Sequence, residues 1–598
     1  MFLVEAAAVS DAETPVITCK QDILLVITFA LSLNTVSCGG SSGVTTNTTA
    51  PSITTQPMNE TVKLGQSAIF AVVANGTAPL SYQWDKNGTA INGATAASYT
   101  TPASTSSDNG ATFAVVVGNA EGSITSHSAT LTVSSVVAPG QLMTLSANGK
   151  YLANSFTGRP VFVVGDDAFD LAVMLDSARV STYLNDRASR GFNAIWVTAA
   201  DNGYQSTPPK NYYGFSPFDG ADFTNEDANY WANIDSVVTQ ASSLGITVFL
   251  QPFFVGNGSE PGYYSSVLDT SDAVMTAYGT FLGNRYNGYN NIVWLLGGDS
   301  LPSTGGLYQK LNDVGAAIAA ADPNHLITLE ACQQCVTNGY NSVQAYQVQS
   351  LPVPSWLNIN WAYPQLTTTV GAAQNAYTAS PFLSPLCGEN NYETSALTEL
   401  DIRFEQYAEI LSGCYVGRLF GNGAIWSFNS PHGDTCCNTG TPSWQSQLAS
   451  PGSISQEYQG RLFSSREHWL LVPDINHAVV TAGYGSGLTV TTAARTSDGQ
   501  TIIAYIPNGN ATTITVAMNQ ITSSTNTVQG WWFNPTTAAT TNIGTFPNSG
   551  TQNFTPPDSN DWVLVLDDTS AQLLAPGAGA PQATGRPRSA RSSHEATH

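Results

Sequence analysis

Between residues 142 and 473 the chain alternates amphipathic stretches with short apolar runs, a pattern typical of helices followed by buried strands. The runs are rich in Val, Ile, Leu and Trp and are too short for buried helices. We expect eight strands at residues 162–165, 193–198, 246–251, 292–296, 325–330, 355–360, 383–387 and 423–427. Eight strand–helix units over about 330 residues predict a (β/α)8 TIM barrel.

The pattern on either side of the barrel is different. Residues 51–135 and 474–568 alternate apolar and polar positions over short segments, which predicts a β-sandwich in each. The first of them resembles a bacterial immunoglobulin-like domain, with Trp84 at the position of the buried strand-C tryptophan and Phe113 at the tyrosine-corner position. The predicted fold class is therefore a TIM barrel flanked by an N-terminal Ig-like β-sandwich and a C-terminal β-sandwich.

The two ends of the chain predict export and flexibility. Residues 1–38 contain an apolar stretch of signal-peptide length, too short to span a membrane, and end in Thr-Val-Ser-Cys38. This segment resembles a bacterial lipoprotein cleavage site, where Cys38 would carry a lipid anchor; the alternative is an incidental cysteine in a cleaved leader. Residues 39–50 have the composition of a flexible linker, and residues 572–598 that of a disordered tail. We expect an extracytoplasmic protein, secreted or anchored at the cell surface.

The charge balance limits the partners. The 598 residues include 42 Asp and Glu but only 19 Lys and Arg, for a formal charge of −23. Binding to nucleic acid needs clustered Lys and Arg against the phosphates, so we expect no nucleic-acid partner.

The barrel region holds six cysteines, namely Cys332, Cys335, Cys387, Cys414, Cys436 and Cys437. An even number in an exported protein predicts disulfides, without fixing their connectivity. The Cys332-Gln-Gln-Cys335 segment could also hold zinc, but no second such pair or spaced His pair follows it. We therefore favour a disulfide there and expect no metal and no cofactor.

Two carboxylates carry the candidate chemistry. Asp299 and Glu389 each follow an apolar run and a glycine, which would place them on the C-terminal face of a barrel, where catalytic groups lie. A pair of carboxylates on that face is typical of the catalytic residues of glycoside hydrolases. The alternative is that each acid caps the helix that follows its strand.

The barrel also resembles the apiosidase-like family of glycoside hydrolases over most of residues 142–567. The similarity is carried by residues 159–166, 183–193, 285–299 and 387–393. Residues 529–535 and 554–566 resemble the collagen-binding-type module of that family. The chain departs from the family pattern where its first, fifth and sixth strands end, at Asp166-Asp167, at Glu330-Ala-Cys and at residues 360–365. These positions line the expected pocket, so the resemblance does not identify the sugar that the pocket accepts.

The resemblance implies a role for each carboxylate. Related barrels have the acid/base at the end of strand 4 and the nucleophile at the end of strand 7, which here are Asp299 and Glu389. To donate a proton near neutral pH, Asp299 would need a pKa raised by burial or by the charge of Glu389. If Asp299 were not the acid, Glu330 and Glu393 would be the next candidates.

Further residues at or near strand ends are candidate substrate-binding residues: Asp166, Asn360, Trp361, Tyr363, Tyr392, Glu393 and Trp426. Asp166 could instead cap a loop, and Glu393 could be structural. The aromatic residues could stack on sugar rings or pack in the core. We interpret His432 as a loop residue rather than a pocket residue.

We therefore predict a secreted or surface-anchored glycoside hydrolase that cleaves plant or microbial polysaccharide by a retaining two-carboxylate mechanism. One alternative is a non-catalytic polysaccharide-binding surface protein built on a decayed barrel; another is an adhesin-like structural protein. The acid pair favours the enzyme, because a protein that only binds has no need of it. The sequence leaves the sugar, the linkage and the oligomeric state open.

Overall fold

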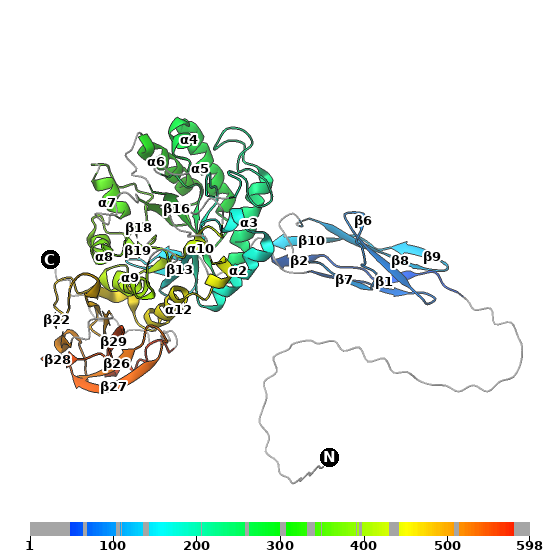
Figure 1. Ribbon diagram of the computed structural model, residues 1–598. Coiled ribbons are helices and arrows are strands. Elements are labelled where there is room, and N and C mark those ends of the chain that lie inside the picture. The colour runs from blue at the N-terminus through cyan, green and yellow to red at the C-terminus, as the bar shows by residue number, and fades with distance from the viewer. Residues whose placement is uncertain are drawn as a thin grey trace, which may run out of the picture.

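A computed structural model describes most of the chain (Figure 1). The described residues are 48–63, 68–102, 108, 110–134, 143–204, 206–256, 262–299, 306–331, 341–348, 350–389, 391–393, 397–429, 442–507 and 513–578. Several predicted features lie outside them, namely the leader with Cys38, residues 39–47 of the linker, Cys332, Cys335, His432, Cys436, Cys437 and residues 579–598 of the tail.

The central domain is a closed barrel of eight parallel strands in sequential order, which confirms the predicted TIM barrel. The strands are β13 (Val163–Asp167), β14 (Ala194–Thr198), β15 (Thr247–Gln251), β16 (Ile292–Gly297), β17 (Ile327–Glu330), β18 (Ile359–Ala362), β19 (Ser384–Cys387) and β20 (Gly417–Phe420). All eight strands are buried throughout, because side chains fill the barrel interior and helices cover its outside.

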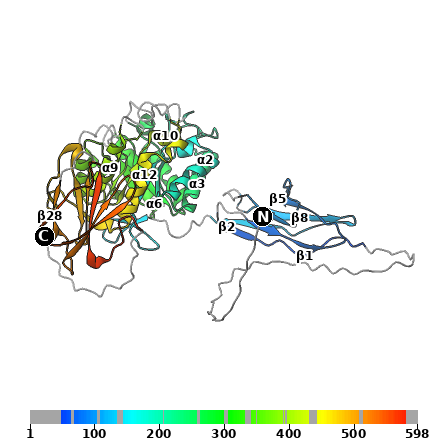
Figure 2. The same ribbon diagram turned by 60° about the horizontal axis from the view of Figure 1, so that its bottom comes forward.

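Helices surround the strands (Figures 1 and 2). They are α1 (Leu171–Met174), α2 (Ser177–Ser189), α3 (Ala228–Ser243), α4 (Tyr264–Asp269), α5 (Asp272–Tyr286), α6 (Leu307–Ala321), α7 (Ser342–Gln347), α8 (Thr369–Thr378), α9 (Glu399–Ser412), α10 (Gly423–Trp426), α11 (Trp444–Gln447) and α12 (Pro451–Ser464). Side-chain caps fix several starts: Asp176 accepts from the backbone of Arg179, and Ser450 caps α12 with Pro451 at its first position. Among the described helices none is long and apolar enough to span a bilayer.

The eighth strand does not lie where the sequence predicted it. Residues 423–426 form the short helix α10, because the Asn422 side chain accepts from the backbone of Ala424 and starts a helical turn. The strand that closes the barrel is β20, six residues earlier, and it contains Arg418. Glu409 of α9 accepts a hydrogen bond of 2.6 Å from this arginine, which makes the charged residue compatible with burial.

A β-sandwich follows the barrel. One sheet has the order β21-β23-β24-β29-β26-β27 and the other β22-β25-β28. Its strands are β21 (Leu471–Pro473), β22 (Val480–Ala482), β23 (Thr492–Thr496), β24 (Thr501–Ile506), β25 (Ile514–Ala517), β26 (Thr527–Phe533), β27 (Thr540–Pro547), β28 (Thr551–Phe554) and β29 (Trp562–Asp568).

The barrel and this sandwich share one hydrophobic core. Helix α9 lies against strands β23 and β24, and its residues 402–412 are all buried (Figure 1). Tyr407 of α9 stacks on Tyr505 of β24 with ring centroids 4.9 Å apart. A buried ion pair adds to this contact, with Arg466 donating to Asp567 at 2.7 and 2.9 Å. The larger sheet therefore packs on the barrel rather than facing solvent.

The N-terminal region forms three small sheets. Their strands are β1 (Ser52–Thr55), β2 (Glu60–Lys63), β3 (Ile69–Ala71), β4 (Val73–Asn75), β5 (Ser81–Lys86), β6 (Thr89–Ala90), β7 (Ser98–Thr100), β8 (Thr112–Asn119), β9 (Gly122–Thr125) and β10 (Ala129–Ser134). Phe70, Trp84, Phe113 and Val115 are buried together in their core. The Ig-like assignment of this region stays a prediction. A hairpin of β11 (Met143–Leu145) and β12 (Leu152–Asn154) precedes the barrel.

Candidate active site

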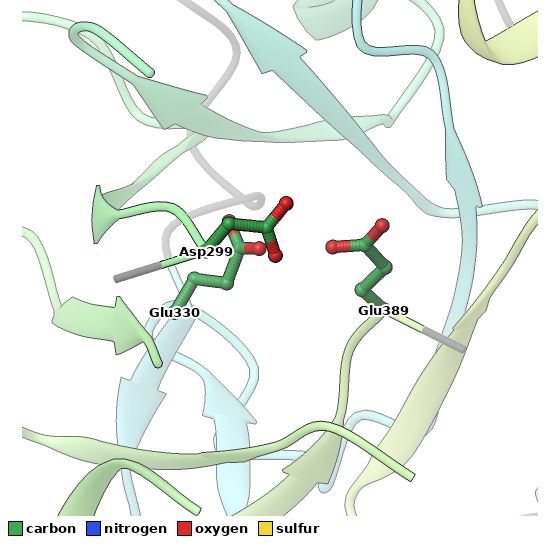
Figure 3. Close-up of side chains that lie close together, drawn as sticks. All are labelled: Asp299, Glu330 and Glu389. Atoms are coloured by element: carbon green, nitrogen blue, oxygen red, sulfur yellow. The ribbon is translucent and has the colours of Figure 1, made fainter. Parts of the chain in front are cut away.

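Three carboxylates converge at the C-terminal ends of the barrel strands (Figure 3). Glu330 is the last residue of β17, while Asp299 and Glu389 follow β16 and β19 by two residues. One carboxylate oxygen from each lies within 4.8 Å of those of the other two. Figure 3 shows Asp299 and Glu330 on one side and Glu389 opposite them. The two acids singled out from the sequence thus lie together on one face, with a third beside them.

Two glycines set the position of Asp299. Gly297 and Gly298 have φ angles of 89° and 117°, and Asp299 itself has a φ of 43°. A Cβ atom on Gly297 would lie 2.3 Å from the carbonyl oxygen of Glu330, and one on Gly298 would lie 2.6 Å from the Phe254 ring. Only glycine fits at either position, and the sharp turn brings the Asp299 side chain over the barrel mouth. The left-handed backbone at a non-glycine residue is typical of functional sites.

The backbone before Glu389 is fixed in another way. A Cβ atom on Gly388 would lie 1.7 Å from Cε2 of Trp361, so the glycine allows the indole to fill the barrel beneath the site. One residue earlier, Cys387 forms a disulfide with Cys414, with their Cα atoms 5.5 Å apart. Packing and a covalent link therefore both hold the end of β19, from which Glu389 projects.

Glu330 is fully buried, and a hydrogen bond fixes its carboxyl group. The Gln251 amide donates to Oε2 of Glu330 at 3.1 Å, and the Thr198 hydroxyl donates to Oε1 of Gln251 at 2.7 Å. Burial raises the pKa of Glu330 well above its ordinary value, and the charges of Glu389 and Asp299 raise it further. These shifts favour the protonated, neutral form of Glu330, which relieves the repulsion among the three acids.

Two tyrosines hydrogen-bond to Glu389. Tyr392 lies 2.8 Å from Oε1 of Glu389, and Tyr363 also forms a hydrogen bond with this carboxylate. The Tyr392 hydroxyl is also 2.6 Å from Oδ2 of Asp167, the last residue of β13. Burial raises the pKa of both tyrosines, and the neighbouring carboxylates raise it further, so both keep their protons. Both tyrosines were candidate substrate-binding residues; the structure places them against Glu389.

Two other candidates for substrate binding need correction. Asn360 lies on β18 but turns outward, donating to the carbonyl oxygen of Ala376 at 3.1 Å and accepting from the backbone of Val343 at 3.2 Å. Trp361 turns inward and is fully buried against the rings of Trp196 and Phe249. Asn360 ties the strand to its helices and Trp361 is a packed aromatic, so neither is offered to a sugar.

Asp166 also needs correction. It is fully buried on the helix side of β13, where Oδ2 accepts from Tyr183 at 2.6 Å and from Arg187 at 3.3 Å. Burial raises its pKa to about 6, although the charge of Arg187 opposes the shift. Asp166 therefore anchors helix α2 to the barrel instead of facing the substrate.

The last two candidates lie at the margin of the site. Glu393 accepts from the backbone of Gly452 at 2.7 Å and from the Asn422 amide at 3.0 Å, which ties the loop after β19 to the start of α12. Trp426 stacks on Phe169 with ring centroids 4.7 Å apart and is 4% exposed. Glu393 is engaged in structure, and one face of Trp426 is already covered.

Two residues of the site were absent from the set of candidates, namely Asp167 and Gln251. The contacts of β13 with the helices distinguish Asp167 from its neighbour Asp166. Val164 contacts α12 at Gly460 and Asp166 contacts α2, so odd-numbered positions face the barrel interior. Gln251 ends its strand as Glu330 does, but an amide carries no signal for this chemistry.

The three acids could also hold a hard cation, because carboxylate oxygens are the ligands that Mg²⁺ and Ca²⁺ prefer. The raised pKa of Glu330 favours a neutral carboxyl group and is compatible with their proximity. The short separation of Asp299 and Glu389 suits a pair that acts on the two atoms of one bond. We assign the cluster to acid–base and nucleophilic chemistry.

Comparisons with known proteins agree with this geometry. A family model described as "Apiosidase-like, catalytic domain" matches residues 146–470. A second one, "Putative collagen-binding domain of a collagenase", matches residues 472–567. Comparison with the curated proteins finds no match.

Solved structures share the fold. One glycoside hydrolase has a TM-score of 0.61 at 22% identity, covering 72% of this chain and 97% of its own. A glycoside hydrolase family 5 protein from Bacteroides vulgatus has a TM-score of 0.61 at 20% identity, covering 72% and 93%. At these identities the likeness shows a common fold over the covered part of the chain.

Proposed function

The chain belongs to the apiosidase-like family of glycoside hydrolases, and we propose that it is an exported enzyme that cleaves plant or microbial polysaccharide by a retaining mechanism. The observation that carries the proposal is the opposition of Asp299 and Glu389, whose nearest oxygens lie within 4.8 Å. Carboxyl groups of retaining enzymes are about 5–5.5 Å apart, whereas inverting enzymes need about 6.5–9.5 Å to admit a water molecule.

In the first step Glu389 attacks the anomeric carbon while Asp299 protonates the oxygen of the departing sugar. The bond from the anomeric carbon to that oxygen breaks, and a bond to Glu389 forms. Tyr363 and Tyr392 orient the attacking carboxylate by hydrogen bonds. Since Asp299 is 7% and Glu389 9% exposed, both act in a largely water-excluded setting, where their electrostatic effects are stronger.

In the second step Asp299, now ionised, accepts a proton from water, and the water oxygen displaces Glu389 from the anomeric carbon. The two displacements return the original configuration at that carbon. The raised pKa of Glu330 favours its neutral form, which adds no negative charge beside the pair in either step.

Export is part of the proposal. The signal-like leader and the Cys387–Cys414 disulfide both favour an oxidising compartment, where disulfides persist. A lipid at Cys38 would hold the enzyme at the cell surface. Mass spectrometry of the protein from its natural host tests this, because an anchored protein would begin at Cys38 and carry the mass of the lipid.

Release of reducing sugar from a panel of plant and microbial glycans tests the activity. The panel includes glycans that contain apiose, the sugar in the family name, and the folded Glu389→Ala variant is the inactive control. NMR of the first product formed distinguishes retention from inversion. If no glycan is cut while one is retained in affinity electrophoresis, the chain is a polysaccharide-binding protein and the enzymatic proposal fails.

A further inference from the structure

The Tyr392 hydroxyl lies between two carboxyl groups. Its oxygen is 2.6 Å from Oδ2 of Asp167 and 2.8 Å from Oε1 of Glu389. Asp167 ends β13 and Glu389 follows β19, two strands that are separated by β20 in the barrel. The tyrosine, which is 7% exposed, therefore bridges the two acids across a strand inside the protein.

The number of hydrogens available at this bridge restricts the charge of the two acids. A phenol carries one hydrogen and donates it to one acceptor, while its oxygen can accept from another donor. If both carboxyl groups were ionised, one of them would face the phenol oxygen at hydrogen-bond distance without a hydrogen between them. A buried contact of that kind is repulsive. One of the two acids therefore carries a proton and donates it to the Tyr392 oxygen.

The surroundings decide which acid holds this proton. Burial raises the pKa of Asp167 well above its ordinary value, and the charge of Glu389 raises it further, against the hydrogen bonds from Tyr392 and the backbone of Phe169. The titratable groups that face the two acids are Asp170 after β13, Asp299 after β16, Glu330 on β17, Tyr363 after β18, and Tyr392 itself, while Asp166 acts on Asp167 by its charge from the helix side of β13. Arg187 donates to Asp166, on the other side of the strand.

We propose that Asp167 is a protonated positioning residue, which donates to Tyr392 and thereby turns the tyrosine hydrogen toward the carboxylate of Glu389. The inference rests on the proposed role of Glu389 as nucleophile, which requires that carboxylate to be ionised. Asp167 acts through Tyr392 and does not touch the substrate. Ionisation of Asp167 would reverse the direction of these hydrogen bonds, because the tyrosine hydrogen would turn to Asp167 and leave Glu389 without this donor.

Infrared difference spectroscopy on the full chain without substrate tests the proton directly. With aspartate labelled with ¹³C at its carboxyl, the wild-type minus Asp167→Asn difference at pH 7 should show the loss of one protonated-carboxyl band. Asp176→Asn is the matched control: its carboxylate caps α2 with a lowered pKa, so only an ionised-carboxylate band should be lost. Loss of an ionised band at Asp167→Asn would overturn the proposal, whether or not the chain proves to be a glycosidase.

Kinetics on the glycan that the release assay identifies tests the consequence for Glu389. Tyr392→Phe should lower kcat/KM about 10- to 100-fold, because a charge-assisted hydrogen bond is lost. Asp167→Ala should lower it about three- to tenfold, and Asp167→Asn should recover most of that loss, since the amide also donates to the phenol oxygen. An Asp167→Asn variant as impaired as Asp167→Ala would mean that the negative charge is needed, and the proposal would be wrong.

Discussion

Asp299 and Glu389 face each other across the barrel mouth with carboxylate oxygens within 4.8 Å, although they follow strands β16 and β19, which are three positions apart in the barrel. Neither residue reaches the other through a local motif. The closed barrel brings them together, with a glycine before each that removes a clash with packed groups beneath or beside it. The geometry of the pair is therefore a property of the whole fold.

Replacement of Asp299 should lower activity by an amount that depends on the leaving group of the substrate. Asp299→Ala is expected to lose about 10²–10⁴-fold on the natural glycan, because the departing oxygen is no longer protonated. Aryl glycosides with acidic phenols should be cut nearly as fast as by the wild type in the first step, which pre-steady-state measurement of phenol release resolves. A folded Asp299→Ala variant with full activity on the natural glycan would show that another residue is the acid.

Glu330 should tolerate loss of its ionisable group better than loss of its side chain. Since burial and the neighbouring charges raise its pKa well above the ordinary value, Glu330→Gln keeps the neutral state and should stay within about tenfold of the wild-type kcat/KM. Glu330→Ala removes the shorter of two hydrogen bonds that the Gln251 amide donates, leaving only the carbonyl oxygen of Gly297 at 3.4 Å, and should lose about a hundredfold. Equal losses in the two variants, measured at pH 7, would contradict a protonated Glu330.

The Cys387–Cys414 disulfide should stabilise the domain that carries Glu389. It closes a loop with a sequence separation of 27, which the chain-entropy estimate converts to about 3.5 kcal/mol of unfolding free energy. The Cys387→Ala/Cys414→Ala variant should show a loss of about this size in urea unfolding. Peptide mapping without reductant should find the Cys387–Cys414 link in protein from its natural compartment; free thiols at both positions there would count against export.

His468 should make the protein less stable as the pH falls. Its ring is buried against Phe162, with Nδ1 3.0 Å from the carbonyl oxygen of Tyr415, and burial lowers its pKa from 6.5 to about 4. Between pH 6.5 and 4, His468 therefore binds a proton in the unfolded chain but not in the folded chain. This difference should remove about 2 kcal/mol of unfolding free energy between pH 8 and pH 5.

Comparison with His468→Asn isolates that contribution. Asp166, with a pKa raised to about 6, acts in the opposite direction over an overlapping range, because the folded chain holds its proton more tightly than the unfolded chain. Both proteins share this effect, so the difference between their urea midpoints at pH 8 and pH 5 reports on position 468. Parallel pH dependences in the two proteins would rule out a neutral, buried His468.

The sequence predicted the barrel well where burial alone shapes a strand. Six of the strand positions follow closely from apolar runs, because side chains and helices cover parallel strands on both faces. The sixth strand, predicted at 355–360, lies at Ile359–Ala362 and overlaps the prediction by two residues. The sequence misplaced the eighth because Arg418, paired with Glu409, interrupts the apolar pattern of the real strand. The apolar residues 423–426 are buried as well, but as a helix that Asn422 caps.

The candidate site was predicted in part for a related reason. Strand-end carboxylates can be found by position, which brings Asp299, Glu330 and Glu389 into view. Position alone does not say which of two neighbours faces inward, and adjacent residues of a strand face opposite sides. Asn360 and Trp361 could not both line a pocket, nor could Asp166 and Asp167. The contacts with surrounding helices that settle each pair come from tertiary packing.

The core shared by the barrel and the terminal sandwich constrains how such a gene can be reassembled by recombination. A crossover between residues 470 and 474 would strip α9 of its cover, exposing Tyr407 and leaving Arg466 without Asp567. A sandwich joined to a different barrel would likewise present a sheet face whose side chains pack against this barrel and not the new one. The two domains should therefore be inherited as a pair, so that their co-occurrence in a genome indicates joint folding rather than two separate activities.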